Sequence, residues 1–111
     1  MYWNRDIFQT AGIASPPEFW DELFVMSPKI TQRDTASNIT RSFAALGEFD
    51  NIEHAKEILS AFIMQSGNKI VVPSDKRLES ILDERLDFVA PPTESAVRFY
   101  TEFSNPIKSV Y

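Results

Sequence analysis

The stretch DNIEHAKEILSAFIMQSGN, residues 50–68, carries the clearest structural signal in the chain. Asp50 is a natural helix N-cap, and Glu53, three residues later, completes a capping box. Apolar residues then recur at the 3.6-residue spacing of a helix: Ile52, Ala55, Ile58, Leu59, Phe62 and Ile63. Because Gly67 supplies a C-terminal stop, the pattern predicts an amphipathic helix over residues 51–67 with one buried face.

The residues before this helix predict a strand, a short helical turn and a second long helix. Residues 2–4 are aromatic-rich and read as a strand, and residues 5–12 read as a helical turn that stops at a glycine. Ser15-Pro16-Pro17-Glu18 then has the capping pattern of a helix start, with Phe19, Leu23 and Met26 on one face. Because proline has no N–H, Pro28 should end this helix near Met26 or Ser27.

The remaining segments add strands and a third helix. A polar loop over 32–38 precedes a predicted strand over 39–46, and 69–72 reads as a short extended segment closed by a proline. Residues 74–92 form a variable excursion, in which Leu78, Ile81 and Leu82 could share one face of a short helix. A helix over 93–103 is capped by Thr93 and turns four residues inward, Ala96, Phe99, Tyr100 and Phe103. The element order predicts an α/β fold in which three main helices pack on a small parallel or mixed sheet.

Length and composition limit the function classes. With 111 residues the chain is one small domain or a piece of a larger one, and its 43% apolar content is enough for a core. Sixteen acidic and eleven basic residues give a net charge of −5, with no basic run longer than Lys76-Arg77, so a nucleic-acid partner is not expected. There is no cysteine, no apolar stretch long enough to span a membrane and no basic-then-apolar leader.

Residues that could support catalysis or metal binding are sparse. Gly12, Gly47 and Gly67 are too far apart for a phosphate-binding loop. His54 is the only histidine, and with Glu53 and Glu57 beside it a solvated helix face is the simpler interpretation, since a metal wants three or four convergent ligands. The serines lack a nucleophile-elbow motif. The sequence therefore predicts no enzyme activity, no cofactor and no metal.

Aromatic and polar residues gather at two predicted strand ends. Tyr2, Trp3 and Asn4 lie on the first strand, and residues 48–51, Glu-Phe-Asp-Asn, follow the second. In open α/β sheets ligands bind beyond the carboxyl ends of the strands, so we expect both groups on one side of the layer. Aromatic faces beside amides and carboxylates suit sugar rings, although aromatic residues in a small α/β layer are more often part of the core.

Three stretches resemble a family signature in order: YWNRDIF at 2–8, AGI at 11–13 and PPEFWDEL at 16–23. They are similar to the Y-x-N-[KR]-D-[LI]-[FL], A-G-[IL] and P-P-x-x-W-[DE]-E-[LF] blocks of bacterial extracellular solute-binding proteins, family 1. These proteins are the binding subunits of sugar-type ABC importers. Residues 39–47, 51–67 and 94–111 resemble the strand and two helices that follow in that family.

The resemblance implies a periplasmic-binding-protein-like (type II) fold, in which two α/β lobes enclose a cleft. The chain resembles the start of the second lobe, so 1–111 is expected to be a single partial domain, with Pro28 and the 74–92 excursion departing from the common pattern. Carried over by position, the expected ligand-binding residues are Tyr2, Glu48, Phe49, Asp50 and Asn51.

The resemblance also implies partners and a location. They are a carbohydrate-like small molecule and the permease subunits of an ABC importer, with the full-length protein in the periplasm or lipid-anchored at the cell surface. Contact with the membrane would come only through the permease or through an anchor that this chain does not carry. A second hypothesis stays open beside it, a stand-alone small α/β interaction domain that kept the fold and lost the cleft.

Overall fold

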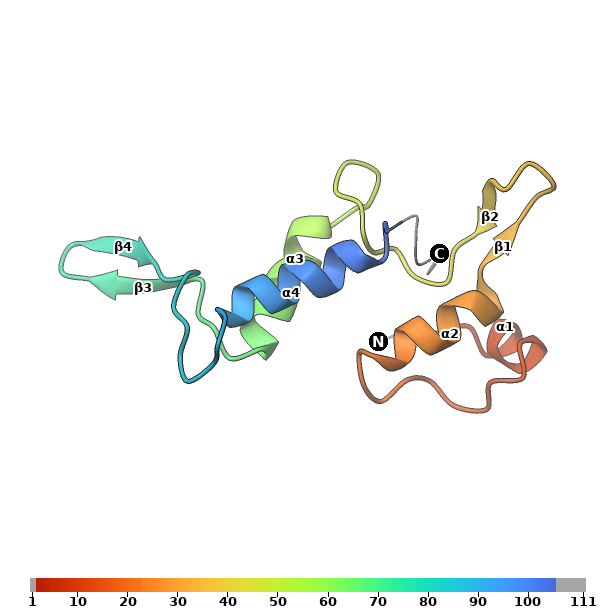
Figure 1. Ribbon diagram of the computed structural model, residues 1–111, viewed down its shortest axis with the longest axis horizontal. Helices are drawn as coiled ribbons and strands as arrows, with labels where there is room; N and C mark the ends of the chain where they lie inside the picture. Colours follow the sequence, from red (N-terminus) through yellow and green to blue (C-terminus); the bar gives the residue numbers. More distant parts are fainter. Residues whose placement is uncertain (1, 106–111) are drawn as a thin grey trace. The chain divides into compact units, whose positions relative to one another are not determined.

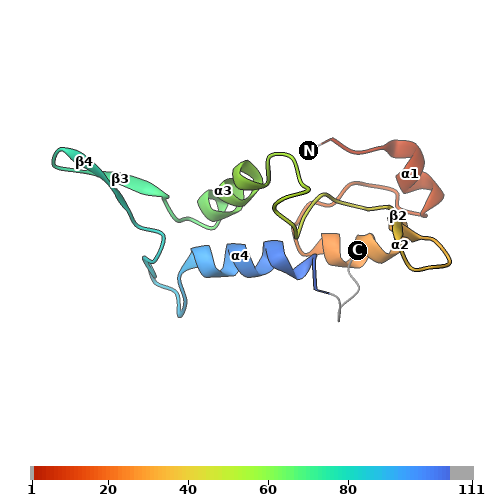
Figure 2. The same ribbon diagram turned by 90° about the horizontal axis from the view of Figure 1, so that it is seen from above.

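The computed structural model describes residues 2–105, which contain four helices and four short strands (Figures 1 and 2). In chain order they are α1 Arg5–Thr10, α2 Glu22–Ile30, β1 Gln32–Arg33, β2 Ile39–Arg41, α3 Ala55–Gln65, β3 Val71–Ser74, β4 Arg77–Ser80 and α4 Pro92–Glu102. The contacts divide the described chain into two compact units. The first comprises residues 2–45 with 104–105, and the second comprises 46–103.

Helix α1 of the first unit is fixed by a cap at each end. The Asn4 side-chain oxygen accepts hydrogen bonds from the Asp6 and Ile7 amides, at 3.0 and 3.2 Å. At the other end Gly12 adopts a φ of +70°, and the amides of Gly12 and Ile13 donate to the Gln9 and Phe8 carbonyls, which is a Schellman motif. The predicted helical turn is confirmed. The strand predicted over 2–4 is wrong, because Asn4 is already the cap of α1.

Helix α2 begins later and ends later than the sequence predicts. The Glu22 carboxylate accepts hydrogen bonds from the amides of Glu18 and Phe19, at 2.7 and 3.2 Å, so it organises a turn where the capping box at Ser15 was expected. Pro28 lies inside the helix. It removes only one backbone hydrogen bond near the C-terminal end, where Ile30 is buried and the Thr31 amide still donates to the Ser27 carbonyl.

Strands β1 and β2 form an antiparallel hairpin, with Gln32 opposite Arg41 and Arg33 opposite Ile39. The Asp34 carboxylate closes its turn by accepting from the Ala36 and Asn38 amides and from the Asn38 side chain. The strand predicted over 39–46 therefore stops at Arg41, and part of the predicted polar loop is its partner strand. The sequence pattern did not predict this turn, which the Asp34 side chain closes.

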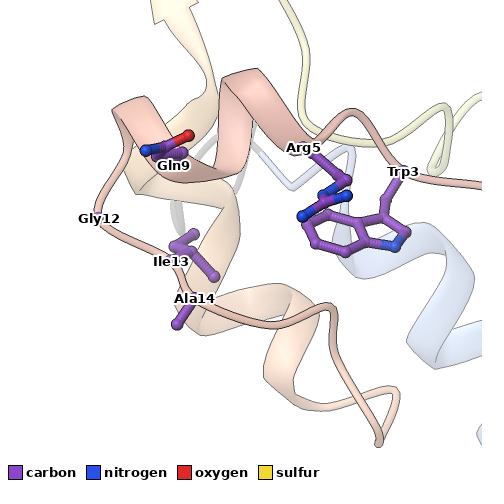
Figure 3. A pocket seen from close by; sticks show the side chains of 6 residues that line it. All are labelled: Trp3, Arg5, Gln9, Gly12, Ile13 and Ala14. Carbon is purple, nitrogen blue, oxygen red and sulfur yellow. The ribbon is translucent and has the colours of Figure 1, made fainter.

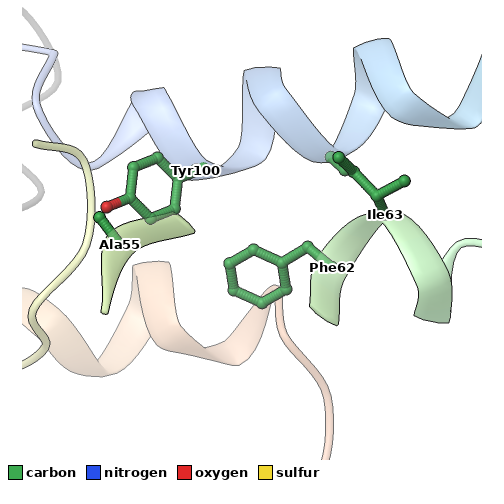
Figure 4. Packing of buried hydrophobic residues seen from close by; sticks show 5 residues of the cluster. Ala55, Phe62, Ile63 and Tyr100 are labelled. Atoms are coloured by element: carbon green, nitrogen blue, oxygen red, sulfur yellow. The ribbon is translucent and has the colours of Figure 1, made fainter. Parts of the chain in front are cut away.

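The core of the second unit lies between α3 and α4, which run side by side (Figure 4). Its buried members come from both helices: Ala55, Phe62, Ile63, Ala96 and Tyr100. Ile52, Ile58 and Leu59 pack against them, so the apolar stripe predicted for this helix is confirmed. The inward face predicted for residues 93–103 is also confirmed. Helix α3 starts at Ala55 rather than after Asp50, because His54 takes a left-handed φ of +63° that a helix cannot contain.

Strands β3 and β4 form a second antiparallel hairpin, in which Val72 faces Glu79 and Pro73 faces Leu78. In both views of the ribbon it extends away from α3 and α4 (Figures 1 and 2). The short helix considered for Leu78, Ile81 and Leu82 is replaced by strand β4 and the turns that follow it. A positive φ at Asp75 makes the tight reversal between the strands.

The α/β class predicted from the sequence is confirmed. The strands differ in their pairing, since they form two separate two-stranded antiparallel sheets rather than one parallel or mixed sheet. Short connections explain the difference, because a parallel pair needs a crossover of a dozen residues or more, whereas both hairpins close within a few. Among the described residues, no helix is long and apolar enough to cross a membrane.

Candidate functional site

The predicted ligand loop, residues 48–51, lies on the surface of the second unit. All four of its residues are exposed, and the Phe49 side chain keeps 63% of its surface in solvent. The hydroxyl of Tyr100 in α4 donates a hydrogen bond to the Glu48 carbonyl, so the start of the loop is tied to the helix pair. The loop thus exposes an aromatic ring, two carboxylates and an amide, and its first residue is held by a hydrogen bond.

Tyr100 keeps its proton at neutral pH and therefore remains a hydrogen-bond donor. Burial of the ring, together with the nearby charge of Glu48, raises the pKa of Tyr100 above its ordinary value of 10.0. The ring itself is packed in the core, beside Phe62 at 6.4 Å between ring centres. One residue therefore joins the core of the second unit to its predicted ligand loop.

His54 stands next to this loop, with two glutamate side chains beside its ring. Its ring nitrogens lie 3.8 Å from a Glu53 oxygen and 3.9 Å from a Glu57 oxygen, with all three side chains largely exposed. In residues 2–105 no three histidine, cysteine or acidic side chains come together as metal ligands. The arrangement is that of a solvated helix start.

The first unit contains an open hollow of about 710 Å³ around α1 (Figure 3). Its lining consists of Trp3, Arg5, Gln9, Gly12, Ile13 and Ala14. Arg5 and Gln9 are four residues apart in a helix, so they project from the same side of α1. Gly12 has open space where a side chain would stand, and this leaves the end of the hollow uncovered.

The hollow combines an aromatic wall with polar groups. The Trp3 indole meets the Phe8 ring edge to face, with 4.9 Å between ring centres, and Phe8 is buried, so the indole is held by packing. Within residues 2–105 the Arg5 guanidinium and the Gln9 side-chain amide have no hydrogen-bond or ion-pair partner. The hollow therefore combines an aromatic side chain, a cation and an amide in its lining.

The residues predicted for the site fall in both units. Tyr2 belongs to the first unit and is fully exposed, but it is not part of the lining of the hollow. Residues 48–51 belong to the second unit, and the expectation that they share a cleft with Tyr2 stays a prediction. Arg5 and Gln9 were not singled out in the sequence. Their four-residue spacing directly after the Asn4 cap is the signal that could have found them.

Comparison with known proteins gives short likenesses to bacterial proteins. A protein of Brucella abortus (strain 2308), provisionally named a binding protein, is 53% identical to the chain over 30 residues. A Brucella suis biovar 1 protein with the same kind of name matches equally. The matched stretch is 27% of this chain and only 7% of the length of these relatives. No protein-family model matches the chain, and no solved structure does.

Proposed function

We propose that this chain is part of a solute-binding protein that captures a carbohydrate-like molecule and passes it to the permease of an ABC importer. One observation carries the proposal: of the six residues that line the hollow in the first unit, four belong to the YWNRDIF and AGI blocks that resemble extracellular solute-binding proteins, family 1. These four are Trp3, Arg5, Gly12 and Ile13. The 30-residue likeness to Brucella proteins named as binding proteins supports a binding role.

The side chains that line the hollow suit non-covalent binding of a sugar. A sugar ring stacks its C–H face on an aromatic side chain while its hydroxyls exchange hydrogen bonds with polar groups, and the Trp3 indole and the Gln9 amide supply these two kinds of contact. In this proposal the protein makes and breaks no bond and uses no cofactor. Capture for import takes place outside the cytoplasm, which gives the full-length protein an extracytoplasmic location.

Exposed apolar side chains support the idea that further protein covers part of this chain in the working molecule. In the first unit Phe19 and Val25 each keep 67% of their surface in solvent, and in the second unit Val89 keeps 96%. Large apolar side chains left in solvent are available for contact with another protein or domain. In a two-lobe binding protein the remainder of the lobe would cover them.

Exposed apolar side chains also favour the second hypothesis, an interaction domain without a ligand cleft. Its strongest support is the run Leu86, Phe88 and Val89, three exposed apolar residues within one turn-rich segment of the second unit. The two hypotheses make opposite predictions for sugars, because only the binding-protein hypothesis requires contact at Trp3 and Gln9.

The test is a titration of the ¹⁵N-labelled chain with neutral mono- and oligosaccharides, followed by NMR. We expect the indole N–H signal of Trp3 and the side-chain amide of Gln9 to shift, with Trp20 as the internal reference, since Trp20 is not among the residues that line the hollow. Gln9→Ala should weaken the response and Gln65→Ala, an exposed glutamine of α3, should not. Shifts at Trp20 alone, or none up to tens of millimolar sugar, would exclude sugar capture by this hollow.

A further inference from the structure

Among residues 2–105, Arg5 is the only charged side chain in the lining of the hollow, and it extends from the start of α1. It is the first residue of the helix, directly after the Asn4 cap, so its backbone cannot move without breaking the two cap hydrogen bonds. Figure 3 shows its guanidinium in the same region of the hollow as the Trp3 indole, with Gln9, Ile13 and Ala14 around the other part. The cation is therefore part of the hollow's lining.

The guanidinium has unused hydrogen-bonding capacity. Arginine carries five N–H donors in a planar fork that matches the two oxygens of a carboxylate. Three other arginines of the described chain use their donors: Arg98 donates twice to Glu94, Arg33 to the Ser37 carbonyl and Arg41 to the Ile30 carbonyl. Among residues 2–105, Arg77 and Arg85 are without such a partner, but neither lines the hollow. In residues 2–105 Arg5 has no such partner.

We infer that the hollow selects an acidic sugar, a uronic acid, whose carboxylate pairs with Arg5 while its ring lies against Trp3 and a hydroxyl meets Gln9. The inference rests on the proposed function, because it names the ligand class of the same hollow. A neutral sugar offers the guanidinium only uncharged hydroxyl acceptors, whereas a carboxylate on the ring makes a charge-assisted, bidentate pair with it. The chain carries a net charge of −5, so its overall electrostatic field repels anions. Binding of an anionic sugar in the hollow therefore depends on the local positive charge of Arg5.

The expected selectivity is modest because the hollow is open to water. A solvent-exposed ion pair gains little, and a bidentate arginine–carboxylate pair is at the upper end of that range. We therefore expect a uronate to bind about threefold to tenfold more tightly than its neutral parent sugar at low salt. The advantage should shrink at high ionic strength, since exposed charges are screened.

The experiment compares four probes by NMR titration of the full 111-residue chain: glucuronate, glucose, glucose 6-phosphate and acetate. The variants are Arg5→Gln, which removes the charge, and Arg5→Lys, which keeps the charge and loses the fork. The matched control is Arg85→Gln, an exposed arginine of the second unit outside the hollow. Amide signals of α1 report whether each variant keeps its fold.

The result that supports the inference is tighter binding of glucuronate than of glucose, lost in Arg5→Gln, reduced in Arg5→Lys and unchanged in Arg85→Gln. Equal binding of glucuronate and glucose, or a preference that survives Arg5→Gln, overturns it while leaving sugar capture standing. Tighter binding of glucose 6-phosphate overturns the choice of a carboxylate, and acetate binding as well as glucuronate overturns the role of the sugar ring. Failure of all sugars to shift Trp3 overturns the proposed function together with the inference.

Discussion

The phenolic hydroxyl of Tyr100 donates a hydrogen bond to the backbone carbonyl of Glu48, 52 residues earlier in the chain. The tyrosine ring is buried between α3 and α4, and the carbonyl begins the exposed loop 48–51. The core of the second unit and this exposed loop are thus connected through one side chain. The position of that loop follows from helix packing rather than from the loop's own residues.

Tyr100→Phe should release the loop without disturbing the helices. The phenylalanine ring keeps the packing, while one net hydrogen bond is lost and a carbonyl is left without its donor, so we expect a loss of about 0.5–1.5 kcal/mol in unfolding free energy. Hydrogen exchange at Phe49 and Asn51 should speed up more than exchange within α3. The control is Tyr2→Phe, because the Tyr2 side chain is fully exposed and has no hydrogen bond to another residue of 2–105. Equal changes in the two variants would contradict the tether.

The β1–β2 turn should loosen at low pH. Hydrogen bonds from the Asn38 side chain and amide, and from the Ala36 amide, lower the pKa of Asp34 below its ordinary value of 3.8. A carboxyl whose pKa is lower in the folded state stabilises that state above the unfolded pKa and loses the effect as pH falls through the folded one. The Ala36 and Asn38 amide signals should therefore move toward random-coil positions only below about pH 4, the unfolded pKa range of aspartate. In Asp34→Asn the same amides should show no such titration.

Phe62→Ala tests the core between α3 and α4. Phe62 keeps only 6% of its surface in solvent and meets the Phe99 ring at 5.3 Å between centres, so truncation leaves a cavity. Large-to-small core changes of this kind cost about 3–5 kcal/mol. Denaturant unfolding followed by circular dichroism measures the loss, with Phe49→Ala as the exposed control, which should change stability by less than about 0.5 kcal/mol.

If Phe62→Ala does not fold, Phe62→Leu gives a measurable intermediate loss of stability. A change at Phe62 no larger than the change at Phe49 would mean that the helix pair does not pack as the structure has it.

The sequence predicted best those segments in which apolar residues repeat at helical spacing. Ile58, Leu59 and Phe62 recur at helical spacing, and this pattern predicted the buried face of α3. An apolar helix face is buried in a folded protein regardless of which element packs against it. The inward residues of α4 were predicted for the same reason. These are the two elements that contact each other and form the core of the second unit.

The strands were predicted less well, because turn residues define these short hairpins and no repeating apolar pattern marks them. β1 is two residues long, and only the Asp34 side chain, which accepts from residues 36 and 38, shows that the chain reverses there. The β3–β4 turn depends on a positive φ at Asp75, which no apolar pattern indicates. For the candidate site, Trp3 was within the predicted aromatic group, whereas Arg5 and Gln9 were found only when the fold of α1 showed a hollow beside them.

Asn68 should be a structural link of the second unit. It is 2% exposed, and its side-chain nitrogen donates to the Thr93 hydroxyl at 2.8 Å and to the Leu82 carbonyl at 3.3 Å. The end of α3 is thereby tied to the first turn of α4. Asn68→Ala leaves both acceptors without this donor, so we expect a loss of about 1–3 kcal/mol in thermal or denaturant unfolding. The exposed Asn51→Ala is the control, and a similar small effect at both positions would exclude the link.

The 111-residue chain alone should bind oligosaccharides no more tightly than the millimolar range. A sugar enclosed by two lobes loses most of its water on both faces, whereas the open hollow around α1 contacts one face only, so it provides about half of the contacts of a closed cleft. Millimolar affinity already requires about 4 kcal/mol of binding free energy. Calorimetric titration with a panel of oligosaccharides measures the affinity, and light scattering run in parallel shows whether the exposed apolar side chains cause association. Micromolar binding by the monomeric chain would show that it holds a complete site, and the proposal that it is one part of a two-lobe binding protein would then be wrong.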